Sequence, residues 1–232
     1  YYGRRGAFIL EALRRGKHVL CDKPVCTSLE ELDQIEALSC EKGLAVGCQL
    51  GMPFSPSILA LRELVASGQL GALHQIAFSG QHPLLWGSRA NWYFEPGKHG
   101  GTINDIAIHA IHALPGLTGL TFQSVVAARA WNAYADEVPH FKDSAQFMLT
   151  LSNGCGVLGD VSYAMPAGCG YKLPQYWRIT LYGSGGIAES GVNYDHVFVC
   201  LAACGPGTKT NPFVGSGKFT GLNVVVARPV WL

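Results

Sequence analysis

The sequence predicts an α/β unit, part of a doubly wound parallel sheet, followed by an α+β domain with a mostly antiparallel open sheet. Two patterns carry this prediction. Residues 1–50 alternate short apolar strands with a helix over short links, whereas strand patterns separated by turns dominate beyond Pro53. The chain has 232 residues, 48% of them hydrophobic and 14% charged, which is enough for a substantial core. We place the domain boundary near residue 50, giving domains at 1–50 and 51–232.

The first domain is predicted from four elements: two helices and two short strands. Residues 5–15 carry apolar side chains at helical spacing and end at Gly16. Residues 17–21 form a short strand, and residues 44–48 form a second one. Between them Thr27 or Ser28 caps a helix that has acidic residues in its first turn and apolar residues at helical spacing. Strand, helix and strand with short links make a βαβ unit.

The second domain begins with a helix over residues 57–67, which glycines end. The Asn-Gly pair at 153–154 lies between two alternating runs and predicts a hairpin. Gly183-Ser184-Gly185-Gly186 also predicts a hairpin turn, not a phosphate loop, because no helix follows it. No structure is predicted for residues 193–232, where glycine and proline interrupt the pattern. The predicted strands are 74–81, 124–133, 144–151, 155–165 and 177–182.

Charge and cysteine content narrow the class of protein. The net charge is +1, so the chain has no basic surface that would favour nucleic acid, and no apolar run approaches the ~20 residues of a membrane span. The chain shows no signal peptide and starts at Tyr1 inside a helical pattern, so we expect its start to be cut. The eight cysteines form no C-x-x-C pair, which favours buried free thiols in a reducing compartment, the cytoplasm.

The segment Gly100-Gly101 to His112 is the sharpest local feature. The glycine pair allows a tight turn or a close backbone approach before a helix. On that helix Asp105, His109 and His112 are spaced to project from one face of an otherwise apolar element. A carboxylate beside an imidazole handles protons. Two alternatives stay open: a self-satisfied polar patch or helix cap, and a metal site with His99 as the nearest extra ligand.

Asp22-Lys23-Pro24 is the second feature, because it lies where a parallel strand ends and a ligand crevice is expected. Lys23 offers a positive donor to a hydroxyl, carbonyl or phosphate, and Pro24 allows a cis turn. A group of aromatic and basic side chains before the glycine pair either lines a sugar-sized pocket or packs the core. Its members are Trp86, Arg89, Trp92 and Tyr93.

Taken together, the run from Gly16 through Asp22-Lys23-Pro24, followed by Gly100-Gly101 and Asp105-x-x-x-His109, resembles the Gfo/Idh/MocA oxidoreductase family. The strand of that family usually ends Glu-Lys-Pro, and its later motif reads Gly-Gly-x-x-x-Asp-x-x-x-His-x-x-Asp. The resemblance implies that residues 1–50 are the remnant of a Rossmann sheet. It also implies an NAD- or NADP-dependent dehydrogenase of a sugar, polyol or related hydroxyl compound, which pairs with its own copies through the open sheet.

The resemblance also implies residue roles. Lys23 would lie between the nicotinamide ribose and the substrate hydroxyl, and His109 would be the general acid/base. Asp105 would orient His109 or bind a neighbouring hydroxyl, and no metal is expected. The implied cofactor contacts are Asp22, Lys23 and Pro24, and the implied substrate contacts are Lys23, Trp92, Asp105, His109 and His112.

Three departures from the family pattern keep other functions open. Asp22 replaces the usual Glu, His112 stands where Asp is common, and no G-x-G-x-x-G follows a strand, so the choice between NAD and NADP is not readable. One alternative is a non-catalytic sugar-binding or regulatory relative without a cofactor site. The other is a metal-dependent lyase or isomerase that uses Asp105, His109 and His112.

Overall fold

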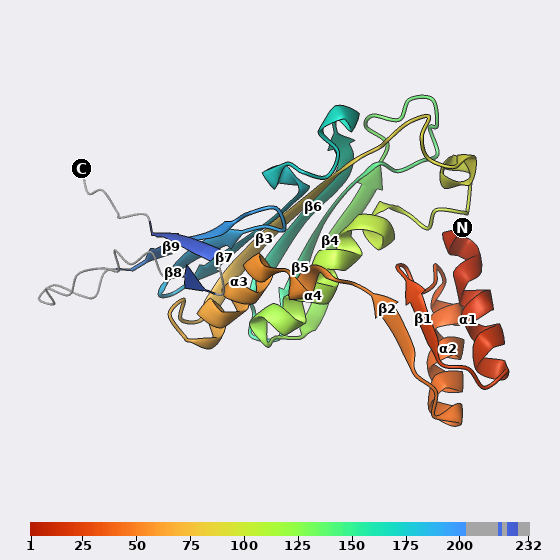
Figure 1. The fold of residues 1–232 in the computed structure, drawn as a ribbon, viewed down its shortest axis with the longest axis horizontal. Coiled ribbons are helices and arrows are strands. Elements are labelled where there is room, and N and C mark those ends of the chain that lie inside the picture. The colour runs from red at the N-terminus through yellow and green to blue at the C-terminus, as the bar shows by residue number, and fades with distance from the viewer. Residues whose placement is uncertain (203–217, 220–221, 227–232) are drawn as a thin grey trace, which may run out of the picture.

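The chain forms two sheets in the computed structural model, which describes residues 1–202, 218–219 and 222–226 (Figure 1). The helices are α1 (Arg5–Arg14), α2 (Leu29–Lys42), α3 (Pro56–Ala66) and α4 (Ile108–Thr118), with short helical turns η1 (Tyr2–Arg4), η2 (Met52–Phe54), η3 (Asn91–Phe94), η4 (Ile103–Ala107), η5 (Ala167–Cys169) and η6 (Pro174–Tyr176). The strands are β1 (Val19–Asp22), β2 (Val46–Gln49), β3 (Leu73–Pro83), β4 (Phe122–Trp131), β5 (Ser144–Leu151), β6 (Gly156–Met165), β7 (Trp177–Gly183), β8 (Gly186–Ser190), β9 (His196–Leu201), β10 (Lys218–Phe219) and β11 (Leu222–Val226).

The N-terminal unit is the predicted βαβ arrangement. Strands β1 and β2 pair in parallel, with Val19 opposite Val46. The Ser28 hydroxyl accepts a hydrogen bond from the Glu31 amide at the start of α2, and Gly43 ends that helix with a φ of 61°. Helices α1 and α2 bury apolar side chains that the strand residues pack against: Ile9, Leu10, Leu13 and Ile35.

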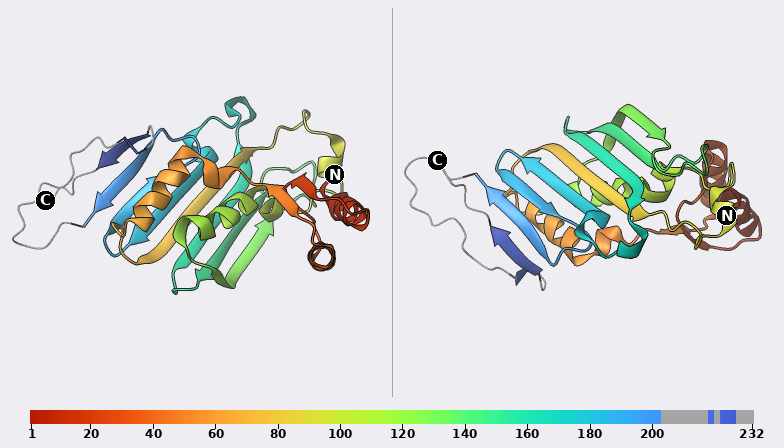
Figure 2. Two further views of the ribbon diagram at one scale, coloured as in Figure 1. Left: turned by 60° about the horizontal axis from the view of Figure 1, so that its bottom comes forward. Right: turned by 90° about the horizontal axis from the view of Figure 1, so that it is seen from above.

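Within the described residues, the second sheet has nine strands in the order β10-β11-β9-β8-β7-β3-β6-β5-β4. Its neighbouring strands are antiparallel except for the pairs β3–β6 and β9–β11, which are parallel. Helices α3 and α4 both lie on one face of this sheet (Figure 2). The main core lies between that face and the two helices, and includes Ile76, Phe78, Phe147, Ile179 and Leu181 from the strands. The predicted α/β unit followed by a mostly antiparallel open sheet is therefore confirmed.

The opposite face of the large sheet carries exposed apolar side chains. Alternation along each strand sends one set of side chains to the helices and the other outward. Met148 and Leu158, which oppose each other on β5 and β6, are 50% and 47% exposed. Further along the same face, Tyr182 opposes Ile187, and Phe198 follows on β9. This outward-facing set is called the open face below.

Two sequence expectations are corrected by the fold. Strand β9 was not predicted, because glycine and proline in the following residues obscured its alternation; the rest of the region from 203 onward, apart from β10 and β11, lies outside the described residues. The thiols are free at the seven described cysteines, but the expectation that they are buried is wrong for all except Cys155. Several of them lie in the small sheet, where Cys21 and Cys48 are only half-buried.

None of the helices within the described residues combines the length and the apolar character that crossing a bilayer requires. The longest, α2, has 14 residues and carries acidic side chains in its first turn.

Candidate active site

The site begins at the carboxyl end of β1, where Lys23 follows Asp22. The Asp22 carboxylate accepts a hydrogen bond from the Lys23 amide at 2.8 Å, and the Lys23–Pro24 peptide bond is cis, which the sequence allowed. Arg5 donates from Nη1 to the Pro24 carbonyl oxygen at 2.6 Å, which ties this turn to α1. The Lys23 side chain is only 14% exposed, since it leaves the strand end and reaches the second sheet domain.

Lys23 meets Asp105, so the two sequence motifs come together in space although they lie 82 residues apart. The Lys23 ammonium donates to Oδ1 of Asp105 and to the main-chain oxygen of the same residue, each at 2.5 Å. Asp105 is buried in η4. A buried carboxylate needs compensating partners, and a cation at this distance is the strongest partner available.

The Asp105 carboxyl is held in its charged form. Burial alone would raise its pKa, but His99 and the Lys23 ammonium keep the pKa well below its usual range. The carboxylate is therefore a permanent negative charge at neutral pH. It orients the ammonium of Lys23 and does not itself take up a proton.

His109 lies on the first turn of α4, with its ring 6.0 Å from that of Trp177. Burial and the nearby Lys23 ammonium lower the pKa of His109 to about 4. The imidazole is therefore neutral at physiological pH and able to accept a proton. A neutral base and an ammonium that influence each other electrostatically form the chemical core of this site.

The glycine pair before η4 allows the close approach that the sequence predicted. Gly100 and Gly101 have φ angles of 84° and 95°, where side chains are rarely tolerated. A Cβ atom on Gly100 would lie 2.4 Å from the Cγ2 methyl of Thr27, which precedes α2. The glycine therefore lets the turn into η4 pack directly on the N-terminal unit, beside the Lys23–Asp105 contact.

The structure corrects the predicted polar stripe of Asp105, His109 and His112. Residues of η4 form a π-helical turn, in which hydrogen bonds run over five residues, so α-helical spacing does not apply across it. His112 is exposed, and the expectation that it shares a buried face with the other two is wrong. Asp105 makes its side-chain hydrogen bonds to Lys23, Tyr93 and Tyr163, and not to His109 as the family resemblance had suggested.

The aromatic and basic side chains before the glycine pair mostly pack against other aromatic rings of the protein. Trp92 is half-buried against Tyr2, with ring centroids 5.2 Å apart, and Trp86 packs on Phe94 at 4.6 Å. Tyr93 is buried and bonds to Asp105. The Arg89 guanidinium lies over the Tyr93 ring at 4.2 Å and donates to main-chain oxygens nearby.

Sequence reasoning missed several members of the site. Tyr163 on β6 bonds to Asp105, and His82 at the end of β3 lies close enough to be affected by the charges of the cluster. His99, which the sequence offered only as an extra metal ligand, bonds to Tyr163 instead. Tyr163 is 58 residues from Asp105, a separation that carries no periodic signal. The pairing of β3 with β6 places Tyr163 beside His82, whereas Asp105 lies in η4 and His99 in the loop before it.

The residues present fit a dinucleotide at the end of β1, the place where doubly wound sheets bind such ligands. Asp22 is exposed there and can accept from a ribose hydroxyl, while the Lys23 ammonium can donate. Within the described part of the chain, no group of three histidine, cysteine or acidic side chains is placed to hold a metal ion. The Asp105 oxygens are already engaged by an ammonium and two phenols.

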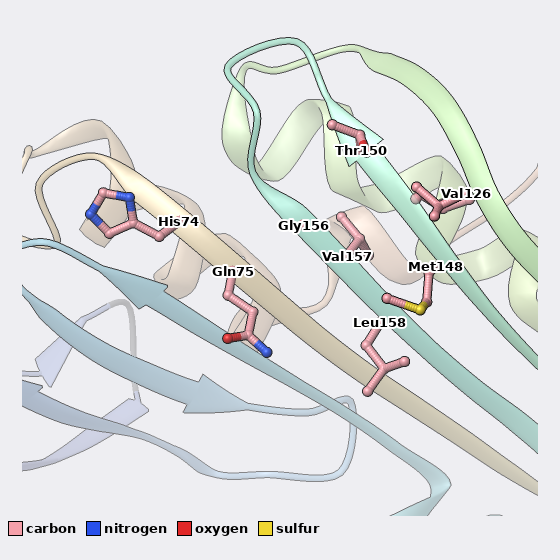
Figure 3. Close-up of a pocket in the computed structure, with 9 residues that line it drawn as sticks. His74, Gln75, Val126, Met148, Thr150, Gly156, Val157 and Leu158 are labelled. Atoms are coloured by element: carbon pink, nitrogen blue, oxygen red, sulfur yellow. The ribbon is translucent and has the colours of Figure 1, made fainter.

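A separate pocket of about 380 Å³ lies on the open face, away from the Lys23–Asp105 pair (Figure 3). Its walls include Gln75, Met148 and Leu158. Val126 also lines it, at a point where the pairing of β4 with β5 shifts register. This pocket belongs to the outward-facing surface of the large sheet and not to the candidate active site.

The two sheets and the lysine–aspartate contact between them define a class, an oxidoreductase built from a Rossmann-type unit and an open-sheet domain. Residues 4–50 match the model of an oxidoreductase family with an NAD-binding Rossmann fold, and residues 58–189 match the GFO/IDH/MocA C-terminal domain. The chain belongs to the Gfo/Idh/MocA family of oxidoreductases.

Similar proteins agree with that family. The chain is 33% identical over 102 residues to 1,5-anhydro-D-fructose reductase of Ensifer adhaerens, which covers 43% of this chain and 30% of that protein. It is 24% identical over 102 residues to the NADP⁺-dependent scyllo-inositol 2-dehydrogenase of Bacillus subtilis, covering 43% of this chain and 28% of that protein.

Solved structures extend the likeness over both sheets. A Thermotoga maritima protein assigned as an oxidoreductase has a TM-score of 0.76 and 26% identity, covering 85% of this chain and 59% of that one. The aldose–aldose oxidoreductase of Caulobacter crescentus has a TM-score of 0.69 and 21% identity, covering 83% and 54%, and so shares the fold. The match thus spans about three fifths of the first of these structures and under a third of the curated relatives.

Proposed function

We propose that this chain is part of an NAD(P)-dependent dehydrogenase that acts on a hydroxyl group of a sugar, polyol or related compound. The observation that carries the proposal is the contact of Lys23 with Asp105 at the end of β1, with neutral His109 nearby. The similarity to 1,5-anhydro-D-fructose reductase and to scyllo-inositol 2-dehydrogenase supports the substrate class. The choice between NAD and NADP is left open in the proposal.

Each of the three residues has a distinct task in this reaction. His109 accepts the hydroxyl proton during oxidation and returns it during reduction, because its imidazole is neutral at physiological pH. The Lys23 ammonium donates to the same oxygen and stabilises the negative charge that develops on it. Asp105 holds that ammonium in place. A bound nicotinamide would supply the hydride acceptor or donor.

The cofactor contacts within this chain are proposed at Asp22, Lys23 and Pro24, at the carboxyl end of β1. Substrate contacts are proposed at Lys23, Asp105 and His109, with Trp92 and His112 as further candidates farther from the buried cluster. Trp92 packs on Tyr2, and His112 is exposed, so their contribution depends on how far the substrate extends.

We also infer that the two parts of the chain have different functions. Residues 1–50 are proposed as the C-terminal part of a dinucleotide-binding domain, and residues 51–232 as a domain for substrate binding and oligomerisation. Two separate clusters of buried apolar side chains support this division. The open face, with Met148, Leu158 and Phe198 exposed, is proposed to pair with a second copy of this chain. Free thiols at the described cysteines support placement in the cytoplasm.

The proposal is tested on the full-length natural protein that contains this chain. Purified protein is incubated with NAD⁺ or NADP⁺ and a panel of sugars and polyols, and formation of reduced nicotinamide is followed by absorbance. We expect His109→Gln and Lys23→Ala each to lower turnover by about 10²–10⁴-fold, the usual contribution of such groups. His196→Gln on β9 is the matched control and is expected to keep wild-type turnover.

Two results would contradict the proposal. One is wild-type protein that binds neither nucleotide, which would favour a non-catalytic sugar-binding or regulatory relative. The other is turnover in His109→Gln within a few-fold of wild type, which would remove His109 from the acid/base role. The metal-dependent lyase or isomerase is disfavoured by geometry, since the ammonium 2.5 Å from Asp105 Oδ1 occupies the position a cation would take.

A further inference from the structure

Three buried side chains around Asp105 have no task in the proposed reaction. Tyr93 on η3 donates its phenol hydrogen to Oδ2 of Asp105 at 2.6 Å, and Tyr163 on β6 donates to the same oxygen. The two phenol oxygens are themselves 2.6 Å apart. His99 lies behind them, with Nε2 3.0 Å from the phenol oxygen of Tyr163. All three residues are buried, with exposed fractions of 6% or less.

The direction of these hydrogen bonds follows from a main-chain contact. The Gly101 amide donates to Nδ1 of His99 at 3.2 Å, so Nδ1 is an acceptor and the ring hydrogen resides on Nε2. Nε2 then donates to Tyr163, and Tyr163 donates to Asp105. A donor chain therefore runs from the glycine pair through His99 and Tyr163 to the carboxylate, where Tyr93 adds a second donor.

Electrostatics fixes the phenols as donors. Burial and the charge of Asp105 both raise the pKa of Tyr93 and of Tyr163 above the ordinary tyrosine value, so both remain protonated. Each phenol can then give its single hydrogen to the carboxylate. Oδ2 is thereby saturated, whereas Oδ1 receives the Lys23 ammonium. Further titratable groups affected by the Asp105 charge are Tyr2, His82, Arg89, His109 and Tyr176.

We propose that Tyr93, Tyr163 and His99 are positioning residues, which lock the Asp105 carboxylate so that Oδ1 faces Lys23 and holds its ammonium at the end of β1. This inference rests on the proposed function, because it assigns the ammonium a task that needs fixed geometry. A lysine side chain has four flexible carbon–carbon bonds and loses much rotamer freedom when its head is held. A carboxylate that two phenols and a cation hold from different sides cannot rotate away from that head.

The test removes the phenol hydrogens and keeps the rings. Tyr93→Phe, Tyr163→Phe and the double variant are made in the full-length natural protein, with Tyr134→Phe, an exposed loop tyrosine, as control. Carbon-13-labelled aspartate reports the titration of Asp105 by NMR, and its signal is assigned as the one missing in Asp105→Asn. Turnover is measured as a function of pH, and thermal unfolding confirms that each variant is folded.

We expect each Phe variant to raise the pKa of Asp105 toward its usual value, and the double variant to raise it further, because each lost donor had stabilised the charged form. The acidic limb of the kcat/KM profile, which His109 sets through its pKa of about 4, should keep its position while the Asp105 pKa remains lower. Turnover should fall about tenfold to a hundredfold per donor, the scale of a hydrogen bond to a charged group. Tyr134→Phe should change neither profile.

Unchanged Asp105 titration in both Phe variants, with lower thermal stability alone, would overturn the inference and leave the tyrosines as packing residues. Absence of dehydrogenase activity in the wild-type protein would instead overturn the proposed function. The NMR titration separates the two failures, since it reports the state of the carboxyl whether or not the protein turns over a substrate.

Discussion

Two histidines near the Lys23–Asp105 pair, the buried His82 and the half-buried His109, differ from ordinary surface histidines in their resistance to protonation. His82 at the end of β3 packs among Tyr176, Tyr171 and Trp177, and its Nε2 has no hydrogen-bond partner within the described residues. Burial lowers the pKa of His82 to about 3, and burial followed by the Lys23 charge lowers that of His109 to about 4. Each ring is therefore held in its neutral form near physiological pH.

The low pKa values of these two histidines predict that the free energy of unfolding falls at acidic pH. Their pKa values in the folded state lie below the unfolded value of about 6.5, so between these limits the unfolded chain binds protons that the folded chain does not. Their full contribution to stability is present above about pH 6.5 and is lost as the pH falls toward about 4, at up to ~1.4 kcal/mol per pH unit for each histidine.

Urea unfolding at several pH values between about 7.5 and 5 measures this slope. The variant His82→Phe keeps an aromatic ring in the cluster and removes the unpartnered nitrogen. It should reduce the slope of the unfolding free energy against pH by the contribution of about one bound proton. Equal slopes in the wild type and the variant would mean that His82 is not buried in its neutral form.

At the scale of elements, the turn into η4 depends on one close approach between segments far apart in the chain. Gly100→Ala combines a positive φ with a clash against the Thr27 methyl, and we expect it to lower the free energy of unfolding by about 2–4 kcal/mol. Gly16→Ala is the matched control, because it has a similar φ of 71° and open space around it, and should cost only about 1 kcal/mol.

The double variant Gly100→Ala with Thr27→Ser isolates the steric contribution, since serine lacks the clashing methyl. It should recover most of the difference between the two glycine variants in a denaturant titration. If the double variant is as unstable as Gly100→Ala alone, the loss comes from the backbone angle and not from packing against the N-terminal unit.

Alternation and turn residues predicted most elements, and their success has a physical basis. Residues 144–151 were predicted as a strand with the observed bounds, because each second side chain is apolar and Asn153-Gly154 closes the hairpin. β9 was missed because its alternation is short and its place in the sheet depends on β8 and β11, which only tertiary pairing supplies.

The residues of the candidate site likewise fall into those that the sequence predicted and those that it did not. Lys23, Asp105 and His109 were found because they lie in two compact motifs that carry a family resemblance. Tyr163 was not assigned a role, and His99 was offered only as an extra metal ligand, because tertiary packing brings them to Asp105 and no local spacing records it. The π-helical turn likewise has no signature in the apolar pattern, so the position of His112 was wrong.

At the scale of the whole molecule, Figure 2 shows that α3 and α4 cover one face of the large sheet, and no long helix of the described residues covers the other. Adjacent apolar side chains on an exposed sheet face are unfavourable in water. Burying them against another protein surface removes this cost. Leu158 and Met148 lie side by side on β6 and β5 and line the pocket shown in Figure 3. The proposed pairing of two copies would bury these side chains.

We therefore expect Leu158→Asp to weaken self-association, because pairing would bury an unpaired carboxylate. Light scattering after size-exclusion chromatography of the full-length protein should show an oligomer for the wild type and a monomer for the variant. Tyr134→Asp, which adds the same charge at an exposed loop position, should keep the wild-type mass. A monomeric wild type would contradict the proposed pairing.

Because Lys23 comes from the end of β1 and Asp105 from η4, neither half of this protein carries a finished site. A gene fusion that joins the large sheet to an unrelated nucleotide-binding half would inherit a buried carboxylate without its cation, at a cost of about 3–5 kcal/mol. Exchange of halves between genes is thus limited to donors that place a lysine at the same strand end. The two parts are inherited together for an electrostatic reason, even though each has a core of its own.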